Sequence, residues 1–257
     1  MKSILFQIRP AFVSAFLINL FYGKSFQRRK VTFIKKYKIS MFTDSFSHLG
    51  HILEKEKTYE DKTSEFILNN LNEDSVFFDI GANEGYFSVL ASKKNIKGKT
   101  YSFEPVQSLI PIINKNISIN KIKNCRVLNI GIGNNNYKTK INLFPEINSG
   151  ASSIIHKYRF FSKSQIIQIK SLDNFYREEN LNFVIDLIKI DVEGYEMQVI
   201  EGMKNLLKNK KIKNLLVDYH LQIISKNDQI KIDKDIISNG YKKTEIEPNY
   251  FLYKLNK

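Results

Sequence analysis

The stretch VFFDIGANEGYFSVLAS, residues Val76–Ser92, determines the fold that this sequence predicts. Its first five residues, Val76–Ile80, form a short apolar run of the kind that is buried in a sheet. The glycines that follow let the backbone turn tightly and approach a ligand closely. Tyr86–Lys94 then has the pattern of a helix, whose first turn offers free N–H groups. The stretch therefore predicts a strand, a glycine-rich turn and a helix, the unit with which a ligand-binding α/β sheet opens.

Strand and helix patterns alternate from about Ser64 onward, which predicts a parallel sheet with helices on both faces. We expect further core strands at Lys99–Phe103, Arg126–Ile130, Val184–Ile190 and Ile212–Val217, and helices at Ser108–Asn120, Gly194–Lys208 and Asn227–Asn239. Ile141–Phe144 and Ile166–Ile169 look like strands that flank a loop, Asn148–Phe161. Two terminal strands, Tyr241–Ile246 and Asn249–Leu255, complete the prediction. The predicted fold is Rossmann-like α/β, with a doubly wound seven-stranded sheet, mostly parallel with an antiparallel C-terminal hairpin.

Polar residues gather where the predicted strands end, and in such sheets ligands bind outside the carboxyl ends of the strands. The first strand ends in DIGANEG, Asp79–Gly85, and the second ends at Glu104. The fourth ends in DVEG, Asp191–Gly194, and the fifth in Asp218-Tyr219-His220. Glu104 follows Gly81 at about the distance where a carboxylate accepts hydrogen bonds from ribose hydroxyls. Because polar residues follow four strands of the same sheet, we expect them to form a single nucleotide-binding site.

The spacing of the glycines indicates which nucleotide this is. A dinucleotide site needs G-x-G-x-x-G to hold a pyrophosphate, whereas Gly81 and Gly85 are spaced G-x-x-x-G among acidic residues. A pyrophosphate would be repelled there, and a ligand with a cationic sulfonium and an amino acid tail would be attracted. A turn-capping role for Asp79 and a solvated helix N-terminus at Glu104 are the alternatives at each position.

With these motifs the sequence resembles the FkbM family of class I methyltransferases. Beside Val76–Ser92, the matching segments are YSFEPVQ (Tyr101–Gln107) with Asn116 and Asn120, GASSI (Gly150–Ile154), SLDNF (Ser171–Phe175) and IDLIKIDVEGYEMQVIEGM (Ile185–Met203). IDLIKIDVEGYE points to this family, whereas the glycine-rich turn alone would indicate class I methyltransferases in general. The resemblance covers Thr58–His220, so we expect a methyltransferase domain at residues 58–257 and a partly amphipathic N-terminal extension at residues 1–57.

The resemblance implies that S-adenosylmethionine is the cofactor. It implies cofactor binding by Asp79, Gly81, Asn83, Gly85 and Glu104, and methyl transfer to an oxygen, often on a sugar or a polyketide-like acceptor. One position departs from the family. The fifth strand end usually reads Glu-x-His, and Asp218 carries a shorter carboxylate whose role is open.

Methyl transfer to a hydroxyl also needs a general base. The unperturbed pKa of a histidine side chain is near neutrality, so His220 is our candidate. Asp191 and Glu193 are expected to orient the acceptor or to contact the cofactor's amino group. The alternative for His220 is a histidine that satisfies backbone groups. The same residues with Asp218 would suit a hard divalent ion, but nothing requires one and we expect no metal. His48, His51 and His156 are expected at the surface or in packing.

The formal charge of +14 can indicate a nucleic acid or an anionic membrane as partner. The lysines are spread along the chain, however, and no basic stripe with interleaved aromatic residues is seen, so a compositional bias explains the charge better than a nucleic-acid surface. Cys125 is the only cysteine and cannot form an intrachain disulfide, which suits the cytoplasm.

The apolar run Ala11–Tyr22 follows Lys2 and Arg9 and precedes the basic cluster Arg28–Lys30. It is too short to span a bilayer, and it lacks a small-residue cleavage site. We expect a helix that packs on its own domain or lies on the cytoplasmic face of a membrane as a peripheral contact.

The sequence therefore predicts an S-adenosylmethionine-dependent O-methyltransferase that acts on a small-molecule or glycan acceptor. An RNA methyltransferase is the alternative, although enzymes of this fold that methylate adenine N6 usually carry an Asn/Asp-Pro-Pro-aromatic turn where this chain has DVEG. A non-catalytic binding protein that retains the fold is the third possibility. The identity of the acceptor is left open.

Overall fold

The structure, a computed structural model, describes residues 11–22, 24–144, 152–155 and 163–256. Its centre is a seven-stranded sheet in the order β11-β12-β10-β9-β3-β4-β5. The strands are β3 (Val76–Ile80), β4 (Lys99–Phe103), β5 (Cys125–Leu128), β9 (Leu187–Ile190), β10 (Asn214–Asp218), β11 (Tyr241–Glu247) and β12 (Tyr250–Leu255). Neighbouring strands from β10 to β5 are parallel, and β12 is antiparallel to both β10 and β11. The predicted fold is confirmed.

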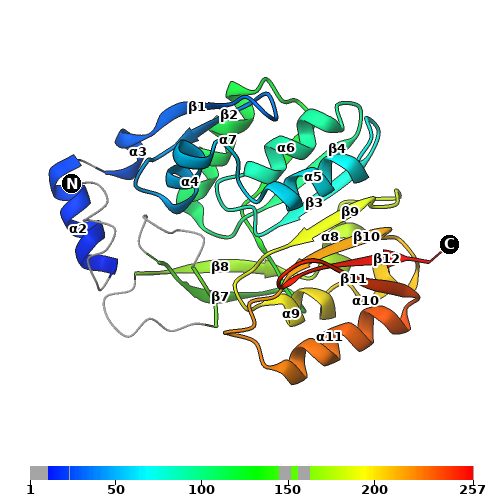
Figure 1. Ribbon diagram of the computed structural model, residues 1–257. Helices are drawn as coiled ribbons and strands as arrows, with labels where there is room; N and C mark the ends of the chain where they lie inside the picture. The colour runs from blue at the N-terminus through cyan, green and yellow to red at the C-terminus, as the bar shows by residue number, and fades with distance from the viewer. Residues whose placement is uncertain (1–10, 23, 145–151, 156–162, 257) are drawn as a thin grey trace.

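Helices cover both faces of this sheet (Figure 1). One face carries α4 (His48–Glu56), α5 (Asp61–Asn70), α6 (Tyr86–Lys94) and α7 (Ile110–Ile119), the last preceded by the 3-10 turn η1 (Gln107–Leu109). The opposite face carries α8 (Leu172–Glu178), α9 (Glu196–Glu201), α10 (Lys204–Lys208) and α11 (Lys226–Ser238). Ser171 and Ser225 cap α8 and α11, because each side chain accepts the N–H of the residue three positions on.

The two faces of the sheet form separate hydrophobic clusters. Phe77 and Leu187 pack toward α4, α5 and α6, whereas Phe78 and Ile188 pack toward α8, α9, α10 and α11, and all four are completely buried. Successive side chains of a strand point to opposite faces. A strand that is covered on both faces must therefore be apolar almost throughout, which makes a charged residue within it conspicuous.

The predicted helix Gly194–Lys208 is two helices, α9 and α10, and the prediction of one helix was wrong. The chain breaks at Gly202, where a Cβ would lie 1.8 Å from the carbonyl oxygen of Gly133. The backbone at this position packs directly against a neighbouring loop, so only glycine fits. Periodicity carries no information about such a contact.

A second, three-stranded sheet has the order β6-β8-β7 and lies beside the main sheet. It consists of β6 (Gly131–Ile132), β7 (Tyr137–Asn142) and β8 (Ser164–Lys170). Of the predicted loop Asn148–Phe161, which includes His156 and the segment GASSI, only residues 152–155 are described, and the rest lies outside the described residues.

The N-terminal segment forms α2 (Ala11–Tyr22), α3 (Ser25–Arg28) and a hairpin of β1 (Lys30–Ile34) and β2 (Ile39–Thr43). The sequence predicted the helix but not the hairpin. Ile34 and Ile39 belong to the same hydrophobic cluster as Phe77 of the central sheet. The segment is thus packed onto the helical layer formed by α4 to α7. Among the described helices, none has the length and apolar composition needed to cross a bilayer.

Candidate functional site

The glycine-rich turn after β3 brings two strand ends into contact. Gly81 has a φ of +83°, and a Cβ there would lie 1.9 Å from the carbonyl oxygen of Asp191, which follows β9. A side chain at this position is therefore excluded both by the backbone conformation and by space. Asn83 and Glu193, which follow the same two strands, have φ values of 51° and 52°. Few non-glycine residues adopt this conformation, which occurs in tight turns and at functional sites.

Glu104 follows β4 and faces this turn. Its carboxylate accepts the backbone N–H groups of Asn83 and Val106, each at 2.8 Å, and the residue is only 5% exposed. Burial raises the pKa of Glu104 to about 7, although the two N–H groups act to lower it. Two hydrogen bonds leave part of the accepting capacity of a carboxylate unused. Glu104 can therefore bind hydroxyl groups of a ligand.

Asp191, Glu193 and His220 follow β9 and β10 and meet at one end of the site. Nε2 of His220 lies 3.7 Å from Asp191 Oδ1 and 3.4 Å from Glu193 Oε2. On the other side of the ring, Nδ1 lies 2.8 Å from Oε1 of Glu196, a fully buried residue at the start of α9. The same oxygen accepts the N–H of Gly194 at 3.1 Å. An Nδ1–H that donates to Glu196 leaves Nε2 free to accept a proton.

The surrounding carboxylates set the ionisation of His220. Burial acts to lower its pKa, but the hydrogen bond to Glu196 and the charges of Asp191 and Glu193 outweigh burial and raise the pKa to about 9. Burial raises the pKa of both Glu193 and Asp218 to about 7, and the charge of Asp191 adds to each shift. Groups with displaced pKa values beside a cavity are typical of acid–base sites.

Lys189 lies in the middle of β9 and supports this cluster from within the sheet. The residue is 1% exposed, and its Nζ donates to Asp191 Oδ2 at 3.0 Å and lies 4.8 Å from the ring centre of Phe87. Burial would raise the pKa of Asp191, but the charges of Lys189 and His220 hold it below its usual value. Lys189 was not predicted as a site residue, although a lysine inside an otherwise apolar strand is a usable signal.

The predicted cofactor residues divide into two groups. Gly81, Asn83, Glu104 and Asp191 line the cavity described below, whereas Asp79 and Gly85 do not. Asp79 is completely buried beside Lys189 in the neighbouring strand, and its carboxylate accepts the hydroxyl of Ser88 at 2.6 Å. Burial raises the pKa of Asp79. Direct contact between Asp79 and a cofactor stays a prediction.

A second wall of the cavity comes from residues that no motif had indicated. Residues 47–49 at the start of α4 line it together with Tyr59 and Glu60. His48, expected at the surface or in packing, is an exposed residue of this lining. Glu60 has a φ of 40°, and its carboxylate accepts the hydroxyl of Tyr250 in β12 at 2.6 Å. The second wall is therefore attached to the last strand of the sheet.

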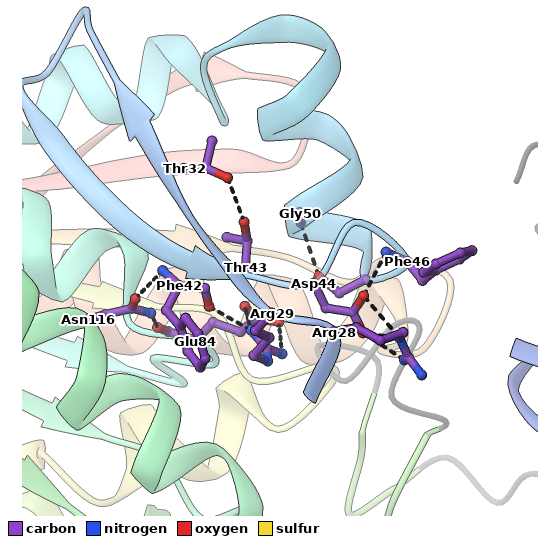
Figure 2. A network of polar contacts seen from close by, with 11 residues as sticks. Arg28, Arg29, Thr32, Phe42, Thr43, Asp44, Phe46, Gly50, Glu84 and Asn116 are labelled. Carbon is purple, nitrogen blue, oxygen red and sulfur yellow. Dashed lines mark hydrogen bonds and ion pairs between the residues drawn. The ribbon is translucent and has the colours of Figure 1, made fainter. Parts of the chain in front are cut away.

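A buried ion pair joins the N-terminal hairpin to the glycine-rich turn (Figure 2). Arg29 donates to both carboxylate oxygens of Glu84, at 2.6 Å and 2.9 Å, and both side chains are at most 2% exposed. Arg29 also donates to the carbonyl of Phe42. Asn116 of α7 donates to the carbonyl of Glu84 and accepts the N–H of Phe42. One network thus fixes the hairpin, α7 and the turn relative to one another.

A second ion pair extends this network to the start of α4. Arg28 donates to Asp44 at 2.7 Å, and the carboxylate of Asp44 accepts the N–H of Phe46 (Figure 2). The hydroxyl of Ser47 then accepts the N–H of Gly50 and caps α4. The N-terminal residues that line the cavity are therefore held by buried polar contacts.

These residues enclose a cavity of about 220 Å³, far larger than the roughly 15 Å³ that one buried water needs. One part of its lining is apolar and includes Phe103, Val106, Leu109, Ile141 and Ile169. The other part carries the acidic residues Glu60, Asp191, Glu193 and Asp218 with His220. The hydroxyl of Ser153, from the segment GASSI, donates to the carbonyl of Glu193 at 2.8 Å. The cavity thus suits a ligand with an apolar body and a cationic end.

Asp191, Glu193 and His220 also offer ligand atoms that all lie within 4.8 Å of one another. Such a set suits a hard divalent cation. The positive charge of Lys189 already lies beside Asp191. It therefore offsets part of the negative charge that a bound cation would otherwise neutralise.

The chain is similar in sequence to known methyltransferases. The family described as Methyltransferase FkbM domain matches residues 79–242. Methyltransferase 1 of Beauveria bassiana (strain ARSEF 2860) is 21% identical over 148 residues, which cover 51% of this chain and 59% of that protein. Methyltransferase sdnD of Sordaria araneosa is 24% identical over 163 residues, which cover 52% and 62%. The chain thus matches about three fifths of the length of these relatives.

Two solved structures match most of the length of this chain at low sequence identity. The precorrin-6y C5,15-methyltransferase of Geobacter metallireducens GS-15 is 13% identical with a TM-score of 0.46, covering 79% of this chain and 92% of that chain. M. jannaschii TYW2 in complex with AdoMet is 16% identical with a TM-score of 0.42, covering 90% and 85%.

Proposed function

The chain belongs to the FkbM methyltransferase family, and we propose that it transfers a methyl group from S-adenosylmethionine to a hydroxyl of a sugar, a glycan or another small molecule. The observation that carries this proposal is the setting of His220. Its Nδ1 is held by the fully buried Glu196 at 2.8 Å, and its Nε2 lies beside Asp191 and Glu193 in the cavity lining. A histidine fixed on one side by a carboxylate is the arrangement of a general base.

The cavity has the groups that S-adenosylmethionine requires. Glu104 has accepting capacity for the ribose hydroxyls, and Gly81 and Asn83 allow close approach of the backbone. The apolar lining near Val106 and Leu109 suits the adenine, and the carboxylate of Asp191 suits a cationic amino or sulfonium group. Asp79 and Gly85 stabilise the glycine-rich turn without lining the cavity. The residues present therefore fit this cofactor, and an anionic pyrophosphate would meet carboxylates instead.

When bound, the cofactor supplies an electrophilic methyl group on a cationic sulfur. The residues of the chain then position the acceptor and remove its proton. His220 accepts the hydroxyl proton at Nε2, while Glu196 keeps the ring oriented and stabilises the resulting imidazolium. Lys189 keeps Asp191 ionised, so that its carboxylate orients the acceptor or the cofactor. Glu193, with a pKa near 7, hydrogen bonds to the acceptor.

The test is a methyl-transfer assay with purified protein and labelled S-adenosylmethionine, offered nucleotide-sugars, glycans and RNA in parallel. We expect label on a hydroxyl of a sugar or other small acceptor and none on RNA. Transfer to RNA alone would replace this function by RNA methylation.

Cofactor binding is tested separately by calorimetry. We expect S-adenosylmethionine to bind and NADH not to bind, and Glu104→Ala to weaken binding by about 1–3 kcal/mol through lost hydrogen bonds to the ribose. Glu73→Ala, which removes an exposed carboxylate paired with Lys97, is the matched control and should leave affinity unchanged. Binding of NADH in place of S-adenosylmethionine would contradict the cofactor assignment.

A further inference from the structure

The N-terminal segment carries an unusual concentration of exposed apolar side chains. Fourteen large hydrophobic residues are exposed in the part of the chain that the structure describes, and seven of them lie between residues 16 and 33. Isolated exposed hydrophobic residues are normal on a protein surface, but a concentration of them marks an interaction site. We call the exposed residues Phe16, Leu20, Phe21, Phe26, Val31 and Phe33 the N-terminal apolar surface.

Helix α2 is apolar on both of its faces. Ile18 is completely buried, whereas Phe16, Leu20 and Phe21 are 65%, 64% and 70% exposed. The helix contains no charged residue, and Arg28, which is paired with Asp44, donates to its Asn19 at 2.7 Å. The inner face is thus attached to the domain, while the outer face meets water. A helix that is hydrophobic all round needs a cover on both faces.

The charge of this segment indicates what covers it. Residues 1–43 contain nine Lys and Arg and no Asp or Glu, although Arg28, Arg29, Lys30 and Lys36 form ion pairs with acidic residues further along the chain. Lys24 and Lys35 are exposed and lie in sequence beside the aromatic residues of the N-terminal apolar surface, whereas Lys30 is paired with Glu54. In a symmetric dimer the same surface would meet itself, and like charges would oppose one another. An anionic surface satisfies both the apolar and the basic residues.

We infer that the N-terminal apolar surface binds an anionic membrane, with α2 lying in the plane of the interface. Twelve helical residues extend about 18 Å, well short of the roughly 30 Å of a bilayer core. Apolar side chains buried at the headgroup boundary, together with lysines facing anionic lipids, are the known basis of such peripheral binding. Helix α2 lies at one end of the molecule, beside α3 (Figure 1), so the membrane can reach its outer face.

Docking there would also orient the catalytic domain. Arg28 joins α2 to Asp44, and Asp44 leads directly to the residues at 47–49 that line the cavity. Because these contacts are largely buried ion pairs and hydrogen bonds, the cavity has a fixed orientation relative to the N-terminal apolar surface.

Co-sedimentation of the full chain with lipid vesicles tests this inference. We compare phosphatidylcholine vesicles with vesicles that contain phosphatidylglycerol, at low and at high salt. Binding to the anionic vesicles should be at least about tenfold stronger and should weaken at high salt. Phe16→Ser with Phe21→Ser should reduce binding about tenfold or more, and Lys24→Gln with Lys35→Gln should reduce it by about fivefold for each lysine.

The matched control lies on α11, where Ile230 and Ile237 are 55% and 47% exposed. Ile230→Ser with Ile237→Ser removes similar apolar area elsewhere and should leave vesicle binding within about twofold. Melting temperatures of all variants verify that they are folded.

Four outcomes would overturn the inference. One is equal binding to neutral and anionic vesicles, and another is unchanged binding by the Phe16/Phe21 variant. The third is a dimer in gel filtration that this variant converts to a monomer without any vesicle binding, which would assign the surface to a second copy of the chain. A membrane-bound fraction that resists alkali would contradict an interfacial position for α2.

Discussion

The two walls of the cavity differ in origin and in physical character. One wall consists of residues that follow the strands β4, β9 and β10, and its acids and His220 have displaced pKa values. The other comes from residues before the family match, and it is held by buried pairs such as Arg29 with Glu84. The strand-end wall supplies groups that can gain or lose protons. The N-terminal wall is held rigidly in place by the ion pairs Arg28–Asp44 and Arg29–Glu84, in which opposite charges neutralise one another.

The largest expected effect is on the strand-end wall. His220→Ala should lower turnover by on the order of 10²–10⁴ if His220 is the general base, with cofactor affinity and melting temperature nearly unchanged. Steady-state kinetics and calorimetry measure these quantities. His51→Ala, which removes an exposed histidine of α4, is the control. Full activity in His220→Ala would transfer the role of base to Asp191 or Glu193.

The next effect is on the N-terminal wall and should appear mainly as stability. Arg29→Ala leaves Glu84 buried without its partner, which should cost about 3–5 kcal/mol of unfolding free energy. Lys36→Ala removes an exposed ion pair with Asp61 and should cost less than about 1 kcal/mol. Denaturant unfolding measures both. A stability loss in Arg29→Ala no larger than in Lys36→Ala would end the distinction between the two walls.

The pH dependence of turnover sharpens the comparison further. Only neutral His220 can accept a proton, so a pKa of about 9 predicts turnover that rises about tenfold per pH unit above pH 7 and levels off near pH 9. Glu196→Gln removes a group that raises this pKa and should shift the rise to lower pH. Arg29→Ala should leave the pH profile of turnover unchanged. A flat profile would show that His220 is not the group that limits turnover.

The smallest effect is expected at the junction of the N-terminal wall with β12. Tyr250→Phe removes the hydrogen bond to Glu60 and should cost about 0.5–1.5 kcal/mol of unfolding free energy, with a few-fold rise in KM. Tyr37→Phe removes an equivalent bond to Asp61 that lies away from the cavity. It should cause a similar stability loss with unchanged KM. Identical KM values for the two variants would show that the bond to Glu60 does not contribute to ligand binding.

The sequence allowed the strand-end wall to be predicted because topology places it. Once β3, β4, β9 and β10 were recognised by their apolar runs, the residues that follow them had to meet at one edge of the sheet. Glu104, Asp191, Glu193 and His220 line the cavity accordingly. The bounds of β3 and β4 were predicted to the residue. Strand burial is a strong, local signal.

The N-terminal wall could not be predicted, because its position depends on long-range pairs. Arg29 and Glu84 are 55 residues apart, and neither lies in a periodic pattern that indicates a buried partner. The break at Gly202 depends on contact with a distant loop in the same way. Lys189 and Glu196 could have been predicted from the sequence, because both belong to the segment that carried the family resemblance. Only their roles were overlooked.

The bond between Tyr250 and Glu60 has a consequence for the order in which the molecule is made. The two residues are 190 positions apart, so Glu60 leaves the ribosome long before Tyr250 is synthesised. Strand β12 must insert between β10 and β11 before Tyr250 can hold Glu60 in place. Until then the edge of β10 has no partner, and one wall of the cavity lacks its anchor. A nascent chain therefore carries every residue of the strand-end wall before the bond between Tyr250 and Glu60 can form, and this contact is among the last to be made during synthesis.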